Sequence, residues 1–340
     1  MGKILNEDIK KGLSETGENL YHWLEATPEE KQLTCVGPAG ETCVEDHLTV
    51  INESLEKIEE GTFGICEICN MPVDDELLKM DYTATVCLGH YTEEELRQLE
   101  SELELSQVVQ RALLPQHSPM IPGLNIAGFS RPAQIVSGDY FDFIRFKDGA
   151  HGIVMADVSG HGVSAGMLMT SLQTAFNTLV PEALSPTEVL ERINRLYIHN
   201  IKFTTFVTIF FAKFDPPTRI FTYANAGHNA GYLYQASKKK GIWLDPTGPA
   251  IGLMEGFKIG IKQVELKEDD ILLLYTDGIT EAMNTQGEQF GTERLAKLIQ
   301  ETTDLTVQEL ANAILLAASN FAEGKIFIDD ITIITCKVGK

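Results

Sequence analysis

The 340-residue chain lacks long apolar runs, which limits the classes of protein to which it can belong. No such run approaches the roughly 20 residues that a membrane-spanning helix needs. Residues 1–6 contain neither the hydrophobic core of a signal peptide nor the Ser or Thr at position 6 that N-myristoylation prefers. The sequence therefore predicts a cytoplasmic protein with no membrane partner.

Basic residues are also scarce, since 27 Lys and Arg stand against 49 Asp and Glu and the formal net charge is −22. Residues 1–115 hold much of the imbalance, with 8 basic and 25 acidic side chains. Binding to a nucleic-acid backbone needs Lys and Arg to displace counterions, so neither direct DNA binding nor a nuclease activity is expected. The acidic first third would suit solubility or docking on a basic protein surface.

Two close pairs of cysteine or histidine residues lie within residues 66–90. The spacing is Cys66-x2-Cys69, then 17 residues, then Cys87-x2-His90. Two such pairs on tight turns place four N and S ligands around Zn²⁺, and a closed set of four ligands is structural rather than catalytic. A thioredoxin-like redox pair would lie in a βαβ pattern, which is absent here. The spacing therefore predicts one structural zinc ion held by these four residues.

The run from Glu56 to Cys69, EKIEEGTFGICEIC, resembles the zinc finger of the DksA/TraR family of bacterial transcription regulators. The resemblance covers about residues 48–95, although His90 stands where that family has a cysteine. It implies a module that is either a folded spacer or a sensing or polymerase-docking element. The residues leave these alternatives open, and a module of the second kind would have an upstream regulator as a partner.

Helical patterns flank the finger. Apolar residues recur at spacings of three and four, first at Leu48, Ile51, Leu55 and Ile58 and then, after the N-cap candidate Thr92, at Leu96, Leu99 and Leu103. Ser106 and Gln110 place polar side chains at the expected seam, and Pro115 ends the helix. Two heptads are too short for a stable coiled coil alone, so we expect residues 93–114 to pack on a second copy, on another partner or on the next domain.

These patterns divide the chain into an acidic N-terminal segment at 1–47, the finger with its flanking helix at 48–92, a helical linker at 93–115 and a large domain at 116–340. In the first part, Cys35, Cys43 and His47 could form a second metal site, but no ligand spacing supports one. The default expectation there is a loosely ordered acidic segment or short helices.

The large domain consists mainly of expected strands. Apolar stretches predict strands at 125–130, 134–146, 151–157, 204–214, 219–226, 229–235, 257–266, 270–276 and 331–337. Helical spacing predicts helices at 162–180, 186–200, 291–300 and 306–321. The run from Lys238 to Gly241 is most simply a hairpin turn. Strand runs separated by pairs of helices indicate an α+β arrangement in which helices cover the outer faces of two sheets.

Four aspartates of this domain lie where predicted strands begin or end, each in a short glycine-rich or polar turn. They are Asp139 in SGDY, Asp157 in ADVSGHG, Asp277 in YTDG and Asp329 in IDDIT. Carboxylates at the ends of buried strands repel one another unless a cation lies among them. Ligand sets made only of oxygen select hard divalent ions, so the pattern predicts a Mg²⁺ or Mn²⁺ site, near which Val158 also offers its carbonyl.

The order and spacing of these motifs resemble the PPM-type (type 2C) Ser/Thr phosphatases, in particular their bacterial SpoIIE/RsbU branch. The markers are QRALLP at 110–115, SGDYFD at 137–142, ADVSGHG at 156–162, NAGHN at 225–229, YTDGITE at 275–281 and DDIT at 329–332. The resemblance covers about residues 105–338. It implies a four-layer αββα sandwich with two Mn²⁺ or Mg²⁺ ions at one end.

The resemblance also implies the ligands and the reaction. Asp139 and Asp157 would bind metal together with the Val158 carbonyl. Asp277 and Asp329 would complete the ligands of the second ion, whereas Asp330 would support a ligand. The four aspartates are thus the candidate catalytic residues, acting through a metal-activated water that attacks phosphorus in line. The implied substrate is a phosphoserine or phosphothreonine protein, and for this branch an anti-sigma-factor antagonist of a bacterial partner-switching pathway.

Other interpretations stay open at this stage. His161 and His228 are each a candidate general acid or a structural histidine, and Cys336 is expected in the core. A function of a different class is a non-catalytic, transcription-associated zinc-finger regulator that uses a degenerate phosphatase domain for binding. Retention of all four carboxylates disfavours that alternative, because a degenerate site would have lost ligands.

Overall fold

The structure is a computed structural model that describes the greater part of the chain. The described residues are 40–73, 84–90, 92–133, 135–160, 162–200, 206–253, 258–323 and 329–339, with the single positions 10, 13, 14, 21, 78 and 256. The chain divides into two compact units, 1–102 and 103–340, and the boundary lies within helix α5 (Glu93–Leu113). No helix of the described residues is long and apolar enough to cross a membrane.

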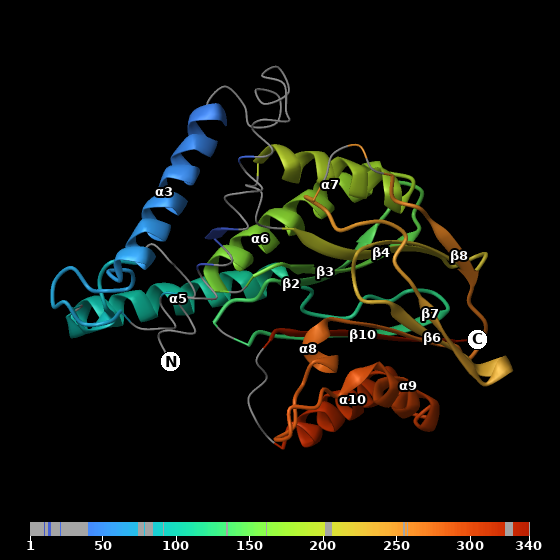
Figure 1. The fold of residues 1–340 in the computed structure, drawn as a ribbon. Coiled ribbons are helices and arrows are strands. Elements are labelled where there is room, and N and C mark those ends of the chain that lie inside the picture. Colours follow the sequence, from blue (N-terminus) through green and yellow to red (C-terminus); the bar gives the residue numbers. More distant parts are fainter. Residues whose placement is uncertain are drawn as a thin grey trace. The chain divides into compact units, whose positions relative to one another are not determined.

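The first unit contains helix α3 (Gly40–Glu60) and the finger that follows it (Figure 1). The apolar stripe predicted there lies on α3, where Leu48 and Ile51 are buried. After the helix, a small separate core forms from Phe63, Cys66, Val73 and Leu78. A short 3-10 helix, η1 (Leu88–His90), ends the finger. A core of this size gives little stability by itself, so a cross-link such as a bound metal would contribute strongly.

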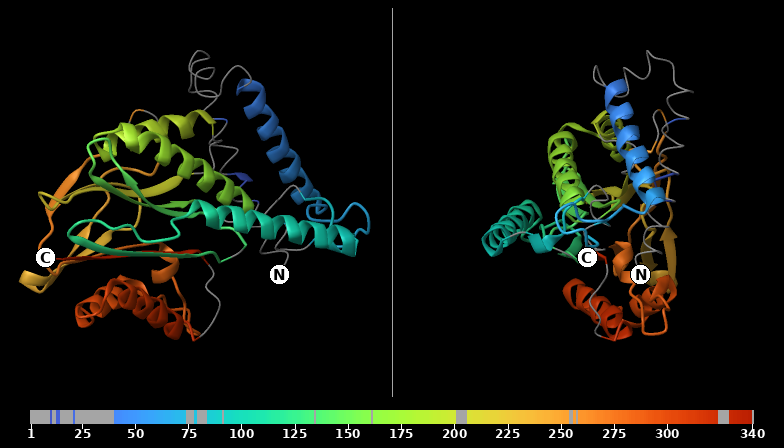
Figure 2. Two further views of the ribbon diagram at one scale, coloured as in Figure 1. Left: turned by 180° about the vertical axis from the view of Figure 1, so that it is seen from behind. Right: turned by 60° about the vertical axis from the view of Figure 1, so that its left-hand side comes forward.

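In the described part of the second unit, ten strands form two five-stranded antiparallel sheets (Figures 1 and 2). The first sheet has the order β2 (Asp139–Arg145), β3 (His151–Val158), β4 (Val207–Asp215), β5 (Ile220–Ala226) and β8 (Lys262–Glu265). The second sheet has the order β1 (Leu124–Arg131), β10 (Ile331–Val338), β9 (Ile271–Tyr275), β6 (Gly231–Gln235) and β7 (Lys240–Leu244).

Helices cover the outer face of each sheet, which gives four layers (Figure 1). The first sheet is covered by α6 (Gly162–Leu179) and α7 (Pro186–Asn200), which are separated by the short 3-10 helix η2 (Val180–Glu182). The second sheet is covered by α8 (Asp277–Thr280), α9 (Gly291–Glu301) and α10 (Val307–Phe321). The predicted α+β sandwich of αββα type is confirmed.

Strand β4 shows why the sequence folds into these layers. It is buried on both faces, and neighbouring side chains of a strand point to opposite faces. Phe210 therefore packs between the sheets against Tyr223, while Phe211 points to the helical layer and lies 5.0 Å from the ring of Phe176 on α6. A strand buried in this way needs a continuous apolar run instead of an alternating pattern.

Three of the sequence predictions differ from the structure in their bounds. The strand expected at 257–266 is observed only as β8 (Lys262–Glu265). The strand predicted at 134–146 begins only at Asp139. The Ile135 carbonyl, both backbone groups of Ser137 and the Gly138 N–H bond to the side chains of Gln107, Gln110 and Asp330, and among the hydrogen bonds described for this loop only that of the Gly138 carbonyl goes to β3.

The hairpin expected at 238–241 is confirmed but lies two residues earlier, because β6 and β7 pair from Gln235 and Lys240. The turn between them is made by the 3-10 helix η3 (Ala236–Lys238) and a left-handed Lys239 with φ 48°. Strand β7, which follows directly, has no apolar alternation strong enough to predict it.

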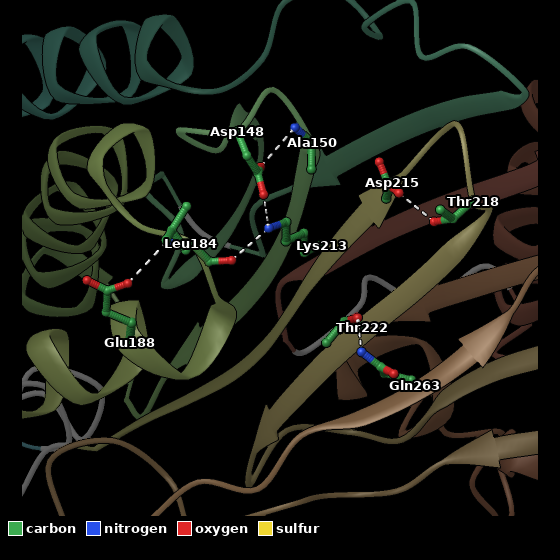
Figure 3. A network of polar contacts seen from close by, with 9 residues as sticks. All are labelled: Asp148, Ala150, Leu184, Glu188, Lys213, Asp215, Thr218, Thr222 and Gln263. Atoms are coloured by element: carbon green, nitrogen blue, oxygen red, sulfur yellow. Dashed lines mark hydrogen bonds and ion pairs between the residues drawn. The ribbon is translucent and has the colours of Figure 1, made fainter.

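A polar network fixes the end of the first sheet opposite Asp139 (Figure 3). The Lys213 ammonium on β4 donates to the Asp148 carboxylate and to the Leu184 carbonyl, and it lies 5.1 Å from the centre of the Phe146 ring. The hydrogen bond from Lys213 lowers the pKa of Asp148. The lysine thus ties the β2–β3 turn to the segment between η2 and α7, far along the strands from the aspartates.

Candidate functional site

The two aspartates of the first sheet lie side by side. Asp139 is the first residue of β2, Asp157 lies one residue before the end of β3, and the two are directly paired in the antiparallel register. Directly paired residues point to the same face of a sheet. The preceding run, 151–156, is completely buried, so the core anchors β3 and Asp157 lies at its end, partly exposed.

The two aspartates of the second sheet reach this end from β9 and β10. Asp277 follows β9 as the first residue of α8, and Asp329 lies two residues before β10. The two strands are neighbours, and beyond their ladder the Thr276 N–H still donates to the Thr332 carbonyl over 3.0 Å. The chain therefore leaves β9 and enters β10 at adjacent points, which brings the two carboxylates together.

Thr276 connects the two sheets at this site. Its hydroxyl donates to Asp139 Oδ2 over 2.8 Å, and the hydroxyl oxygen of Thr276 accepts from the Thr332 N–H over 2.9 Å. Thr276 has no exposed surface and Asp139 is 1% exposed. A side chain of the second sheet thus holds the buried aspartate of the first, and the predicted convergence of the four motifs is observed.

Burial and mutual repulsion raise the pKa values of three of the aspartates. For Asp139, burial and then the charge of Asp157 raise the pKa well above its ordinary value. For Asp157, burial followed by the charges of Asp277 and Asp329 raises the pKa to about 8. Burial and the charge of Asp329 raise the pKa of Asp277 to about 6. These couplings join the four residues into one electrostatic cluster.

The donor set of this cluster fits a hard divalent cation. Partly buried carboxylates that repel one another are stabilised by a positive charge, and oxygen ligands select Mg²⁺ or Mn²⁺. The carboxylates are more widely spaced than the ligands of a single compact site. Among the described residues, the Cys66 group is the only one with three or more candidate ligand atoms all within 4.8 Å of one another.

Asp330 supports the site through its backbone contacts. Its Oδ1 accepts from the Ala133 N–H over 2.7 Å, and its Oδ2 accepts from the Ser137 hydroxyl and the Gly138 N–H, each over 2.8 Å. Both carboxylate oxygens are therefore engaged in holding the loop before Asp139. This arrangement agrees with the expectation that Asp330 supports a ligand.

Two glycines let the backbone close around the aspartates. A Cβ atom on Gly138 would lie 3.0 Å from the Val158 carbonyl oxygen, and one on Gly278 would collide with the Asp330 carbonyl oxygen. Gly138 thus keeps the Val158 carbonyl next to Asp139, while Gly278 lets the start of α8 pack against the segment before β10. Any larger residue would push these segments apart.

The structure favours a structural role for His228. It is buried, its Nδ1 lies 2.8 Å from the Thr208 hydroxyl, and its backbone N–H donates to Asn225 Oδ1 over 2.8 Å. Burial lowers its pKa to about 4, so the ring is neutral near pH 7 and has no imidazolium proton to give to a leaving group. The second candidate acid, His161, lies outside the described residues and stays a prediction.

The four predicted zinc ligands come together in the first unit. One candidate ligand atom from each of Cys66, Cys69, Cys87 and His90 lies within 4.8 Å of all the others, and the Cys69 and Cys87 sulfurs are 3.7 Å apart. Burial raises the pKa of the Cys66 thiol, but backbone N–H donors outweigh it and lower the pKa to about 6. Burial and the neighbouring thiols raise the pKa of Cys87 to about 11.

A second metal site was considered from the sequence at Cys35, Cys43 and His47. Cys35 and the side chains of Cys43 and His47 lie outside what the structure describes.

Three supporting residues have roles that the motifs alone did not reveal. Thr276 and Ser137 bind the Asp139 side chain and backbone, and Gln110 binds the loop before it. Gln110 carried the one sequence signal, a polar side chain at an apolar seam. The roles of both hydroxyl groups depend on contacts between distant segments, which no local pattern reports.

Comparison with solved structures defines the class of the second unit. The chain superposes on the SiaA-PP2C domain of Pseudomonas aeruginosa with a TM-score of 0.62 and 21% identity, covering 71% of this chain and 98% of that one. At this identity the likeness establishes the fold, which is that of the PP2C-type phosphatases. PP2C-type domains use divalent metals, in agreement with the donor set described above.

The family follows from the sequence comparison. The family model described as Stage II sporulation protein E (SpoIIE) matches residues 147–339, so the chain belongs to the SpoIIE family. Phosphoserine phosphatase RsbU of Bacillus subtilis is 28% identical over 78% of this chain and 80% of its own length. Phosphoserine phosphatase RsbP of the same organism is 28% identical over 52% of this chain, which spans 45% of that protein.

Proposed function

We propose that the protein is a metal-dependent phosphatase that hydrolyses phosphoserine or phosphothreonine in a protein substrate. The observation that carries this proposal is the convergence of four aspartates from two sheets at one end of a PP2C-type sandwich, linked by the bond from Thr276 to Asp139. Membership of the SpoIIE family and similarity to two phosphoserine phosphatases support it. The non-catalytic alternative is not favoured, because all four carboxylates are present.

Different residues at this end of the sandwich would contribute ligands to the two metal ions. Asp139 and Asp157 would bind the metals together with the Val158 carbonyl, and Asp277 and Asp329 would complete the ligands of the second ion. The wide spacing of the carboxylates suits two ions better than one. Bound Mn²⁺ or Mg²⁺ would supply an activated water nucleophile and would neutralise charge on the phosphoryl oxygens.

The remaining side chains orient these ligands. The hydroxyl of Thr276 engages one oxygen of Asp139 and so fixes the plane of that carboxylate. Asp330 accepts hydrogen bonds from the Ser137 hydroxyl and the Gly138 backbone N–H, which keeps Asp139 at the start of β2. Positioning of this kind lowers the cost of reorganisation when charge develops in the transition state.

The substrate class comes from the comparison with RsbU. We propose a phosphorylated anti-sigma-factor antagonist of a bacterial partner-switching pathway, acting in the cytoplasm. The test is release of phosphate from a phosphoserine form of such a protein by the full-length chain, with Mn²⁺, Mg²⁺ or EDTA. Hydrolysis with metal and none with EDTA is expected. Binding of the phosphoprotein without any release of phosphate would support the non-catalytic alternative.

We also propose that the finger binds one structural Zn²⁺ ion, held by Cys66, Cys69, Cys87 and His90. The compact tetrad and the small core around Cys66 support it. We expect one zinc per purified chain by elemental analysis and less than about 0.2 in the Cys66→Ala variant. The matched control is Cys336→Ala, which removes a buried thiol from β10 and should keep its zinc. Equal zinc in both variants, or none in the wild type, would refute the site.

A homodimer through residues 93–114 is a further part of the proposal. The part of α5 in the second unit exposes Leu105, Val108 and Val109, which are 64, 62 and 54% exposed. An exposed apolar strip of this kind on a helix is typical of a surface that packs on a partner. Sedimentation velocity on the full-length chain and on Val108→Glu would reveal the dimer and its loss.

A further inference from the structure

An aromatic side chain, Phe206, immediately precedes β4 on the face of the first sheet that carries Asp157. The Asp157 backbone is paired with that of Thr208 on β4. The ladder continues beyond the strands, because the Ser159 N–H donates to the Phe206 carbonyl over 2.9 Å. Residues two positions apart on a strand point to the same face, and so do directly paired residues. Phe206 therefore shares its face with Thr208 and Asp157.

The backbone of Phe206 is held through both of its polar groups. Its carbonyl accepts from the Ser159 N–H, and its own N–H donates to the Ser159 hydroxyl, each over 2.9 Å. One residue later, Val207 exchanges two backbone hydrogen bonds with Ile251, over 2.9 and 2.8 Å, and neither residue has any exposed surface. Phe206 is thus fixed to the turn that follows Asp157 and to the buried core.

The Phe206 side chain is nevertheless 39% exposed, whereas the next residue of the chain, Val207, is completely buried. An aromatic ring offers a large apolar surface and loses little conformational entropy when it is covered, since it has only two rotatable side-chain bonds. Because the backbone is already ordered, contact with the ring gains hydrophobic free energy without the cost of ordering a loop. The ring is therefore suited to binding an apolar group of a partner.

The distance from Phe206 to the aspartates indicates which partner would cover the ring. A strand rises roughly 3.3 Å per residue, so Phe206 lies roughly 7 Å along the strand from Thr208, the residue paired with Asp157. An extended peptide advances by about the same distance, roughly 3.3–3.6 Å per residue. A phosphoserine bound at the aspartates would therefore place a side chain one or two residues away against the Phe206 ring.

We propose that Phe206 is a specificity-determining residue that binds an apolar side chain next to the phosphoserine of the protein substrate. The inference rests on the proposed function and adds to it a preference for the sequence around the phosphorylated residue. The phosphoryl group would bind at the aspartates with their metal ions, while the neighbouring apolar side chain packs on the ring. A small phosphate ester carries no such side chain and cannot use this contact.

The test measures how strongly two phosphoserine peptides inhibit the hydrolysis of p-nitrophenyl phosphate by the full-length protein at saturating Mn²⁺. One peptide has two leucines on each side of the phosphoserine, and the other has two alanines on each side. For the wild type, the inhibition constant of the leucine peptide should be about 5- to 20-fold lower, the effect expected from a few buried methylene groups. For Phe206→Ala, this preference should fall to about twofold or less. Each preference is a ratio within one variant, so a general change in activity cancels.

The control is Leu184→Ala, which removes an exposed apolar side chain beside the Lys213 network, at the opposite end of the sheet. It should keep the wild-type preference. A Phe206→Ala protein that melts earlier but keeps the preference would show a merely structural role and overturn the inference. Should that variant not fold, Phe206→Gln, which keeps a side chain of similar length, decides by the same criterion.

The same assay separates this inference from the proposed function. A wild type that hydrolyses p-nitrophenyl phosphate but is inhibited equally by the two peptides, or by neither, would refute the role of Phe206 and leave the phosphatase assignment intact. A wild type that hydrolyses no phosphate ester with Mn²⁺ or Mg²⁺ would refute the proposed function and the inference with it.

Discussion

The Asp277→Asn variant is expected to lose phosphatase activity almost completely, with kcat reduced by at least about 10³-fold. This factor corresponds to roughly 4 kcal/mol of transition-state stabilisation. An amide offers one neutral oxygen in place of a charged carboxylate, so the site at the start of α8 would hold a divalent ion weakly and neutralise less charge on the phosphoryl group. Steady-state hydrolysis of p-nitrophenyl phosphate and of a phosphoserine protein at saturating Mn²⁺ measures the loss.

The matched control for this variant is Asp215→Asn. Asp215 lies at the end of β4, in the same domain, and accepts a hydrogen bond from Thr218 (Figure 3). The same substitution there should leave kcat within about twofold, since it lies at the far end of the strands. Activity retained by Asp277→Asn at saturating Mn²⁺ would contradict the assignment of Asp277 as a metal ligand.

The metal-free protein is expected to gain stability when Asp157 is replaced by asparagine, and the gain should increase with pH. Burial and the neighbouring carboxylates raise the pKa of Asp157 from 3.8 to about 8. The folded state therefore keeps a proton that the unfolded chain releases, and its stability falls as the pH rises from about 4 to about 8. Asparagine cannot ionise, so this loss is absent in the variant.

The expected difference at pH 8.5 is about 2 kcal/mol, or roughly 4–8 °C in Tm. Asp157 is partly exposed, and solvent screening keeps the effect below what the raised pKa alone would give. At pH 3.5 the difference should nearly vanish, because the carboxyl is then largely protonated in both the folded and the unfolded wild type. Saturating Mn²⁺ should reverse the order, since only the intact site gains about 2.7 kcal/mol at a metal concentration of 100 Kd.

Thermal melts of EDTA-treated proteins at both pH values test this prediction. Asp330→Asn serves as the contrasting variant, because its carboxylate is satisfied by three donors and its replacement should destabilise the metal-free protein. A metal-free Asp157→Asn protein less stable than the wild type at pH 8.5 would show that repulsion among the aspartates is not the dominant effect.

Local patterns predicted the helices and most strands well. The helix expected at 186–200 is observed as α7 with the same bounds, because an apolar stripe and a proline at its start are both local signals. The strand expected at 134–146 was predicted to begin five residues too early, since β2 begins at Asp139. Its apolar residues Ile135 and Val136 suggest a strand, but side chains from α5 and from the segment before β10 take their neighbours' backbone groups.

The sequence was enough to predict the candidate ligands of the site, but it did not show which other residues hold those ligands in place. Asp139, Asp157, Asp277 and Asp329 each carry a local signal, a carboxylate at the end of an apolar strand. The bonds of Thr276, Ser137 and Gln110 join segments more than 25 residues apart, so the motifs that contain these residues do not reveal what they contact. Their roles follow from the docking of the two sheets and of α5, which is a property of the whole domain.

The bridge from Thr276 to Asp139 has a consequence for how this enzyme matures during synthesis. The two pairs of aspartates belong to opposite layers, and the pair at β9 and β10 is translated after the pair at β2 and β3. A nascent polypeptide therefore cannot bring the four aspartates together before β10 has docked. Ions that bind both layers would at the same time clamp them together, so loading with metal and closing of the sandwich favour each other.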